Sequence, residues 1–126
     1  MSNKAIVTEK APAALGPYSA GVVSGNVIHV SGQLGIVPET GDLAGETAAE
    51  QARQSLTNIK NILEAAGADM SNVAETTVLL SDLADFGPVN EVYATFFGEP
   101  YPARACFQVA GLPKAAKVEI KAVAYL

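Results

Sequence analysis

The chain has 126 residues, of which 49% are hydrophobic and only 6% aromatic, and its formal net charge is −5. That length fits a single domain over residues 1–126. An acidic chain without a basic block argues against nucleic acid or an anionic membrane as the main partner. One cysteine and one histidine exclude an intrachain disulfide, a cysteine-rich zinc site and a histidine-cluster metal site. Because no apolar run is long enough for a membrane span and no apolar signal core follows residue 1, we expect a cytoplasmic protein.

The first third of the sequence predicts an irregular arm followed by a β-hairpin. Residues 1–17 contain two prolines, each of which favours extended geometry in the residue before it. The β-prone runs Ser19–Val23 and Val27–Ser31 are separated by residues 24–26 (Ser-Gly-Asn), where Gly and Asn can supply the positive φ of a tight turn. We expect residues 32–35 (Gly-Gln-Leu-Gly) to end the second strand.

The middle of the chain predicts one long helix and one buried strand. Apolar residues recur at three- and four-residue steps within Thr47–Ala66, at Ala48, Ala52, Leu56, Ile59, Ile62, Leu63 and Ala66. Gly67 stands where a glycine commonly terminates a helix. Val73–Leu80 is rich in β-branched residues and predicts a strand.

The last third predicts a second helix and two closing strands. Asp82 or Asp85 is a candidate N-cap, and Pro88 fits the first turn of a helix. The strands Arg104–Val109 and Lys117–Tyr125 follow. The resulting order β-β-α-β-α-β-β indicates an α/β or α+β fold whose sheet carries both helices on one face.

Two of the predicted strand segments are apolar on both sides, Thr76–Leu80 and most of Ala103–Phe107. Strands of this kind are usually buried on both faces of a sheet. Two helices can cover only one face, and an exposed apolar face of this size marks an interface. We therefore expect a homo-oligomer with closed symmetry.

The most suggestive polar residues are Arg104 and Glu119, on what we take to be neighbouring strands. A guanidinium at the start of a strand can hold a carboxylate through two hydrogen bonds. Strand alternation places Glu119 with Lys117 and Lys121 on one face. Glu119 is a candidate general base beside a bound anion, although an ordinary surface salt bridge and a solvated charged face explain the same pattern.

The remaining polar candidates lie at the ends of predicted elements, at Tyr18, Ser31, Asn90 and Cys106. Gly32 beside Ser31 lets a ligand approach the backbone closely. Cys106 has no evident base partner, because His29 lies within an apolar run and is expected to be packed in its strand. No phosphate-binding glycine motif occurs in the sequence.

Seven segments taken together are similar to a known family, and they occur in the same order and at matching spacing. These are Gly16–Gly21, Val30–Gln33, Gln51–Asn58, Thr76–Leu83, Phe86–Asn90, Tyr101–Arg104 and Val118–Ala124. The chain resembles the RidA (YjgF) family of reactive-intermediate, or imine, deaminases over essentially its full length. The resemblance implies a chorismate-mutase-like α+β fold with a mixed sheet. It also implies a homotrimer with inward-facing sheets and a cleft between each pair of subunits.

The resemblance also implies an activity and a set of roles. The family's deaminating members hydrolyse 2-aminoacrylate and 2-imino acids, released by pyridoxal-phosphate enzymes, to 2-keto acids and ammonia without a metal or organic cofactor. Arg104 matches the arginine that binds the substrate carboxylate, and Glu119 matches the glutamate that orients the attacking water. The other cleft positions are matched by Tyr18, Ser31, Gly32, Asn90, Ala105 and Cys106, the last through its backbone carbonyl rather than its thiol.

Three positions depart from the pattern of many members: Ala105 replaces Ser or Thr, Gly111 replaces a larger residue, and Lys121 replaces an acidic residue. They put the rim of the cleft and the substrate range in question but leave Arg104 and Glu119 in place. The alternative hypothesis is a non-catalytic trimer that binds small keto or carboxylic acids. Nucleic-acid cleavage is the weakest hypothesis, because the chain is acidic and has no basic patch.

Overall fold

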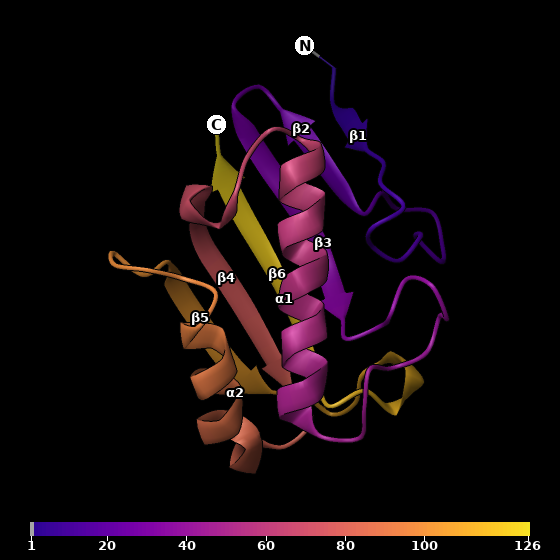
Figure 1. Cartoon of the computed structure of the whole chain (residues 1–126), viewed down its shortest axis with the longest axis vertical. Helices are drawn as coiled ribbons and strands as arrows, with labels where there is room; N and C mark the ends of the chain where they lie inside the picture. The colour runs from indigo at the N-terminus through magenta and orange to yellow at the C-terminus, as the bar shows by residue number, and fades with distance from the viewer. Residues whose placement is uncertain (1) are drawn as a thin grey trace.

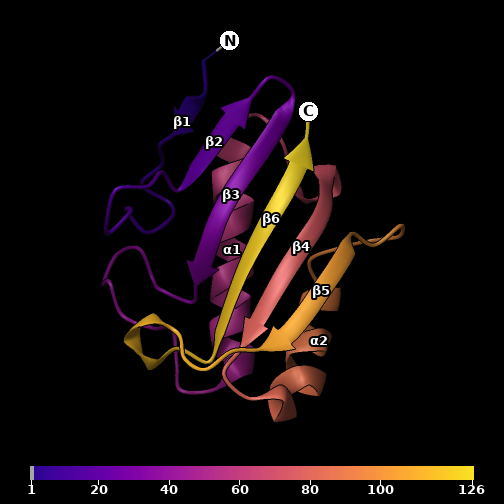
Figure 2. The same cartoon turned by 180° about the vertical axis from the view of Figure 1, so that it is seen from behind.

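The computed structural model describes residues 2–126, which form one six-stranded sheet with two α-helices. The strands lie in the order β1-β2-β3-β6-β4-β5. Their bounds are β1 Lys4–Ile6, β2 Gly21–Ser24, β3 Val27–Leu34, β4 Val73–Leu80, β5 Ala103–Gln108 and β6 Val118–Tyr125. The helices α1 (Ala48–Ala65) and α2 (Phe86–Ala94) lie on the same face of the sheet, as predicted (Figure 1). From behind, the other face carries no helix (Figure 2).

The N-terminal arm was predicted to be irregular, and this prediction is wrong for Lys4–Ile6, which pairs antiparallel with β2. A strand of three residues with one buried side chain, Ile6, is too short to show alternation in the sequence. The pairing is supplied by the edge of β2 rather than by local propensity. Residue 1, the first of this arm, lies outside the described residues.

The hairpin between β2 and β3 forms as predicted, with two corrections. Gly25 has a φ of 62°, but Asn26 does not take a positive φ. β3 also continues to Leu34 instead of ending at Ser31, because the pairing with β6 shifts between Val30 and Gln33 and then resumes. Such an irregularity re-aims the side chains next to it.

Helix α1 has the signals that the sequence predicts at both ends. Thr47 and Glu50 form a capping box. At the other end Gly67 takes a φ of 82°, and the amide of Ala68 donates to the carbonyl of Leu63, as in a Schellman motif. The predicted apolar stripe is buried against the sheet, with Ala52, Leu56, Ile59, Ile62 and Leu63 fully inaccessible.

Polar side chains of α1 hold the segment that leaves β3. Ser55 Oγ donates to the Gln33 carbonyl at 2.6 Å, and Asn58 Nδ2 donates to the Ile36 carbonyl at 2.9 Å. Both side chains are fully buried, so these bonds pair buried polar groups where the chain leaves β3. A Cβ built on Gly35 would lie 2.6 Å from the Cα of Gln51, so the helix and the strand approach each other at a glycine.

Replacing Gly35 by alanine should therefore destabilise the protein by about 1–3 kcal/mol, because the new methyl meets helix backbone that cannot rotate away. Chemical denaturation of both proteins measures the loss. Gly111→Ala is the matched control, since a Cβ at that exposed loop position meets nothing within 4 Å. Equal stability of the two variants would contradict the close approach.

Helix α2 follows a short 3-10 turn, Leu83–Asp85, whose amide at Ala84 is capped by Asp82. Asp85 stands at the N-cap position of α2, but its side chain makes no capping bond, so Asp82 caps the preceding turn and neither candidate caps α2 itself. The crossover through α2 places β5 parallel to β4, whereas β6 runs antiparallel between β3 and β4. β5 and β6 are therefore not neighbouring strands, contrary to the sequence-based expectation.

No helix within residues 2–126 is long and apolar enough to cross a membrane.

Candidate functional site

Glu119 lies on the open face of the sheet, beside two adjoining cavities of about 470 and 270 Å³. Both are lined by Tyr18, Gly32, Pro113 and Glu119, and the larger also by Ser31. The alternation predicted for β6 is confirmed: Val118, Ile120 and Ala122 are buried under the helices, and Glu119 points the other way. Four of the predicted site residues thus share one surface.

The Glu119 carboxyl is half-buried, and burial raises its pKa above the ordinary value, with no opposing hydrogen bond or charge within residues 2–126. Gly32 makes this position possible, because a Cβ there would lie 2.6 Å from Glu119 Oε2. A carboxylate held against backbone, partly desolvated and with its oxygens unused, is suited to accept a proton or to orient a water.

Ser31 and Tyr18 close one side of these cavities. Ser31 Oγ donates to the Ser19 carbonyl at 2.6 Å, and the Ser31 amide donates to the Ala20 carbonyl at 2.9 Å. These bonds fix the segment that precedes β2 against β3. Tyr18, at the end of that segment, remains 53% exposed. The serine hydroxyl is used inside the protein, whereas the tyrosine ring is free to meet a ligand.

Arg104 belongs to a second cluster, at the β5 edge of the sheet. Its Nη1 donates to Asn90 Oδ1 of α2 at 2.7 Å, and its guanidinium carbon lies 4.8 Å from the centre of the Tyr93 ring. Arg104, Asn90 and Tyr93 line a cavity of about 300 Å³, to which Tyr101 and Pro102 also contribute. The site therefore has a cation on an aromatic surface.

Cys106 lies two residues beyond Arg104 on the same strand and is partly buried. Burial raises the pKa of its thiol, although the nearby Arg104 charge acts in the opposite direction. A thiol that is neutral at physiological pH is a poor nucleophile. Ala105 points to the opposite side from these two residues, and its strand partner there is Thr77.

The two clusters do not meet within one chain. Arg104 pairs in register with Thr76, which is buried on the helix side of the sheet, whereas Glu119 pairs with Leu79 on β4. Leu79 is three positions after Thr76 on the same strand, so the two side chains point to opposite faces. Arg104 and Glu119 are thus separated both by a strand and by the thickness of the sheet.

Sequence reasoning missed the role of Tyr93, which it treated only as part of the apolar face of the second helix. A signal was present, because Phe86, Asn90 and Tyr93 are spaced i, i+4 and i+7 and so share one side of a helix.

His29 was predicted to be packed, and this is wrong for the single chain: it is exposed on the open face and lines the larger cavity near Glu119. Side chains of β3 point alternately to the two faces of the sheet, and helices cover only the face opposite His29.

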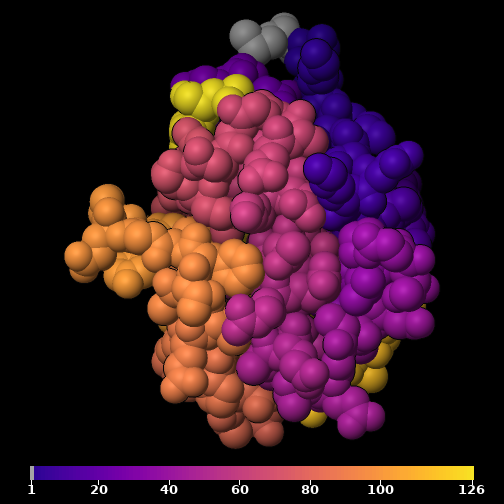
Figure 3. Space-filling model, in the orientation of Figure 1, coloured from indigo at the N-terminus to yellow at the C-terminus, as the bar shows by residue number. Residues whose placement is uncertain are grey.

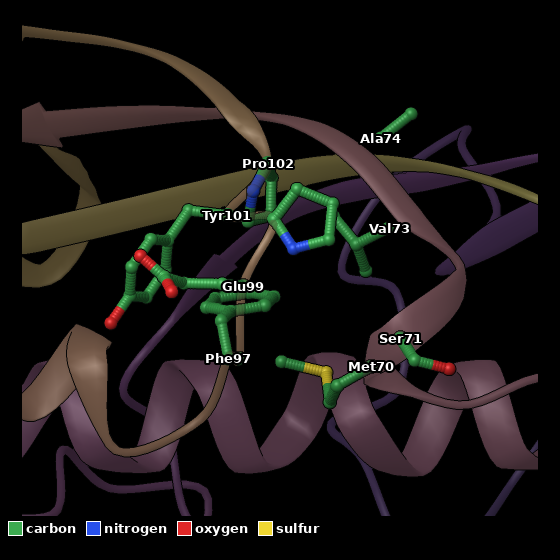
Figure 4. Close-up of a pocket in the computed structure, with 10 residues that line it drawn as sticks. Met70, Ser71, Val73, Ala74, Phe97, Glu99, Tyr101 and Pro102 are labelled. Carbon is green, nitrogen blue, oxygen red and sulfur yellow. The ribbon is translucent and has the colours of Figure 1, made fainter.

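A further cavity of about 310 Å³ lies under the segment that joins α2 to β5 and contains none of the predicted site residues. Figure 4 shows Met70 and Phe97 on one side of it, with Glu99 and Tyr101 on the segment itself. The same segment projects beyond the body of the molecule (Figure 3). No group of three metal-ligating side chains is gathered anywhere in residues 2–126.

The sequence matches a protein family and curated proteins over most of its length. Residues 8–126 match the family model described as endoribonuclease L-PSP. The 2-iminobutanoate/2-iminopropanoate deaminase of Bos taurus is 54% identical over 121 residues, which cover 96% of this chain and 88% of that protein.

Solved structures agree with the fold throughout. RidA from an Antarctic Psychrobacter superposes with a TM-score of 0.94 at 49% identity, covering 98% of this chain and 99% of the other. Escherichia coli TdcF with bound serine superposes with a TM-score of 0.93 at 45% identity, covering 98% of each chain.

Proposed function

Because the chain belongs to the RidA (YjgF) family, we propose that it hydrolyses 2-aminoacrylate and the related 2-imino acids to 2-keto acids and ammonia. The observation that carries this proposal is the pair of complementary groups described above, a preorganised guanidinium and a half-buried carboxylate, each at an open cavity. The relative whose name states this activity is 54% identical to the chain. Serine bound to TdcF supports a small ligand with an amino-acid carboxylate.

The roles follow from the chemistry of the substrate. An imino acid has a carboxylate beside its C=N bond, so the Arg104 guanidinium binds and orients it. Glu119 holds a water against the electrophilic carbon and takes its proton as the C–O bond forms. This proton passes to the nitrogen and gives a tetrahedral intermediate that has a hydroxyl and an amino group on the same carbon. The hydroxyl proton then moves to the amino group as the C–N bond breaks, which releases ammonia and the 2-keto acid. Water is the only co-reactant, so the reaction balances without a cofactor.

The active site on this proposal is shared between copies of the chain. Arg104 and Glu119 lie on opposite faces of one sheet, so a single chain cannot place both on one small molecule. A ring of copies in which the β5 edge of one meets the open face of the next brings the clusters together. We take the ring to be the homotrimer expected from the family, with its open sheet faces turned inward as a barrel.

Mixing two inactive variants tests both the activity and the shared site. The substrate is generated in the assay by an amino acid oxidase or a dehydratase, and loss of the imine is followed. Arg104→Ala and Glu119→Gln are each expected to be inactive, but randomly mixed trimers should recover about a quarter of the parental activity, since one cleft in four receives both intact groups.

Each outcome of the mixing experiment has a clear meaning. No recovery on mixing, with an active parent, would show that the site lies within one chain. A parent that binds 2-keto acids tightly without turnover would instead favour the non-catalytic binding protein, which needs Arg104 but not Glu119. Ribonuclease activity, which the family model's description suggests, gains no support from a chain with a net charge of −5.

A further inference from the structure

Arg104 is exposed, yet its guanidinium lies over two aromatic rings of α2. Its carbon lies 4.8 Å from the centre of the Tyr93 ring and 5.5 Å from the centre of the Phe86 ring. A long exposed arginine ordinarily samples many rotamers, and contact with a ring face restricts it while leaving the N–H groups at the edge of the plane free. Asn90 accepts one of these N–H groups at 2.7 Å.

The Tyr93 ring is itself fixed from two sides. Its hydroxyl and the Thr76 hydroxyl are 2.8 Å apart in a buried hydrogen bond. Thr76 is the residue of β4 that pairs in register with Arg104, so the ring is tied to the strand beside the one that it supports. On its other side the Phe97 ring packs at a centroid distance of 4.7 Å and a tilt of 40°.

The charge of the cluster is suited to this arrangement. Tyr93 is only 6% exposed, and burial raises the pKa of its phenol, with Thr76 and the Arg104 charge acting in the opposite direction. The hydroxyl therefore stays protonated at physiological pH and keeps its bond to Thr76. Among residues 2–126, the hydrogen-bond partner of the Arg104 side chain is the neutral amide of Asn90 rather than a carboxylate.

We propose that Tyr93, locked by Thr76, is a positioning residue that presents the Arg104 guanidinium to the substrate carboxylate. This inference rests on the proposed function and adds the means by which the carboxylate clamp is preorganised. Tyr93 itself need not touch the substrate. The ring sets the plane of the guanidinium, Asn90 accepts from one nitrogen, and Arg104 lines the cavity together with Tyr101 and Pro102.

The proposal predicts a particular kinetic signature. A clamp that grips the carboxylate equally in the ground state and the transition state affects binding rather than the chemical step. Tyr93→Leu, which removes the ring, should raise KM about tenfold and leave kcat within about twofold of the parent. Tyr93→Phe keeps the ring but frees it from Thr76, so it should raise KM by a smaller factor.

A matched control separates positioning from loss of stability. Ile62→Val weakens the fully buried core of α1 far from Arg104, and this variant should keep the parental KM. The substitution Arg104→Lys should cost less activity in the Tyr93→Leu background than in the parent, because without the Tyr93 ring the planar guanidinium is no longer oriented. An unchanged KM in both Tyr93 variants would overturn the proposal, and so would additive effects of the two substitutions.

The test remains decisive if a variant is unstable or the parent shows no turnover. If Tyr93→Leu does not fold, Tyr93→Phe supplies the kinetic comparison. A parent without turnover rejects the proposed function, and calorimetric titration with 2-oxobutanoate then takes the place of KM. Weaker binding to Tyr93→Phe than to Ile62→Val supports the positioning role, whereas equal binding, or no binding to the parent, overturns it.

Discussion

Replacing Arg104 by alanine is expected to lower kcat/KM for 2-imino acids by about a hundredfold or more, equivalent to about 2.7 kcal/mol or more of lost transition-state binding. The loss arises because the substrate carboxylate would enter a cavity whose remaining lining at Asn90, Tyr101 and Pro102 has no charge to meet it. The fold should survive, since the Arg104 side chain is exposed. Initial rates with imine generated in the assay, over a range of precursor concentrations, measure the effect.

The control for this prediction is the other arginine of the sequence, Arg53, which is exposed on α1. Arg53→Ala removes the same charge without touching either cluster and should leave kcat/KM unchanged. Parental activity in Arg104→Ala would show that the substrate carboxylate is bound elsewhere and would reject the assignment of the site.

Replacing Glu119 by glutamine should abolish turnover while leaving 2-keto acid binding intact. The amide keeps the shape of the side chain but cannot accept the proton of the attacking water. In the parent, activity should fall as the pH is lowered through the Glu119 pKa, and the fall should begin at a higher pH than for an ordinary glutamate, because burial raises that pKa. Steady-state rates against pH and binding by calorimetry measure the two parts.

The same substitution should raise thermal stability near neutral pH. The pKa of Glu119 is higher in the folded state than in the unfolded state, so folding favours the protonated form. The free energy of unfolding therefore falls as the pH rises from the unfolded-state pKa through the folded-state pKa, because the carboxylate is charged while partly buried. Glu119→Gln removes this buried charge, so the variant should have a higher Tm than the parent above the folded-state pKa, and the difference should disappear at acid pH. Glu39→Gln, at an exposed loop position, is the control and should show no such pH-dependent gain.

A second variant reaches the same carboxylate without altering it. Gly32→Ala would place a methyl 2.6 Å from Glu119 Oε2, and the flexible end of the glutamate would have to move. Activity in this variant should drop more than stability does. Full activity in both Gly32→Ala and Glu119→Gln would remove Glu119 from the mechanism.

The sequence was most informative where one local pattern determines the structure. The stripe from Ala52 to Leu63 and the capping residues Thr47 and Gly67 predict α1 to within a residue or two. The alternation of β6 likewise places Glu119 on the face away from Ile120. In both cases the periodicity of the side chains coincides with the burial that the fold provides.

Long-range pairing explains the predictions that failed. The strand Lys4–Ile6 exists only because β2 offers an edge, and Asn26 keeps a negative φ because Gly25 alone makes the turn. Strand order has no local signature, so the expectation that Arg104 and Glu119 sit on adjacent strands could not be checked from the sequence. Their separation by β4 changes the interpretation from a site within one sheet to a site between copies.

The position of β6 has a consequence for how the protein is made. The strand nearest the C-terminus of this sequence lies between β3 and β4, near the middle of the sheet. During synthesis the ribosome therefore releases both of its neighbours first, each with an unpaired edge available to other chains. The nascent protein cannot complete its sheet until Val118–Tyr125 has emerged, and until then the unpaired edges of β3 and β4 are exposed to aggregation.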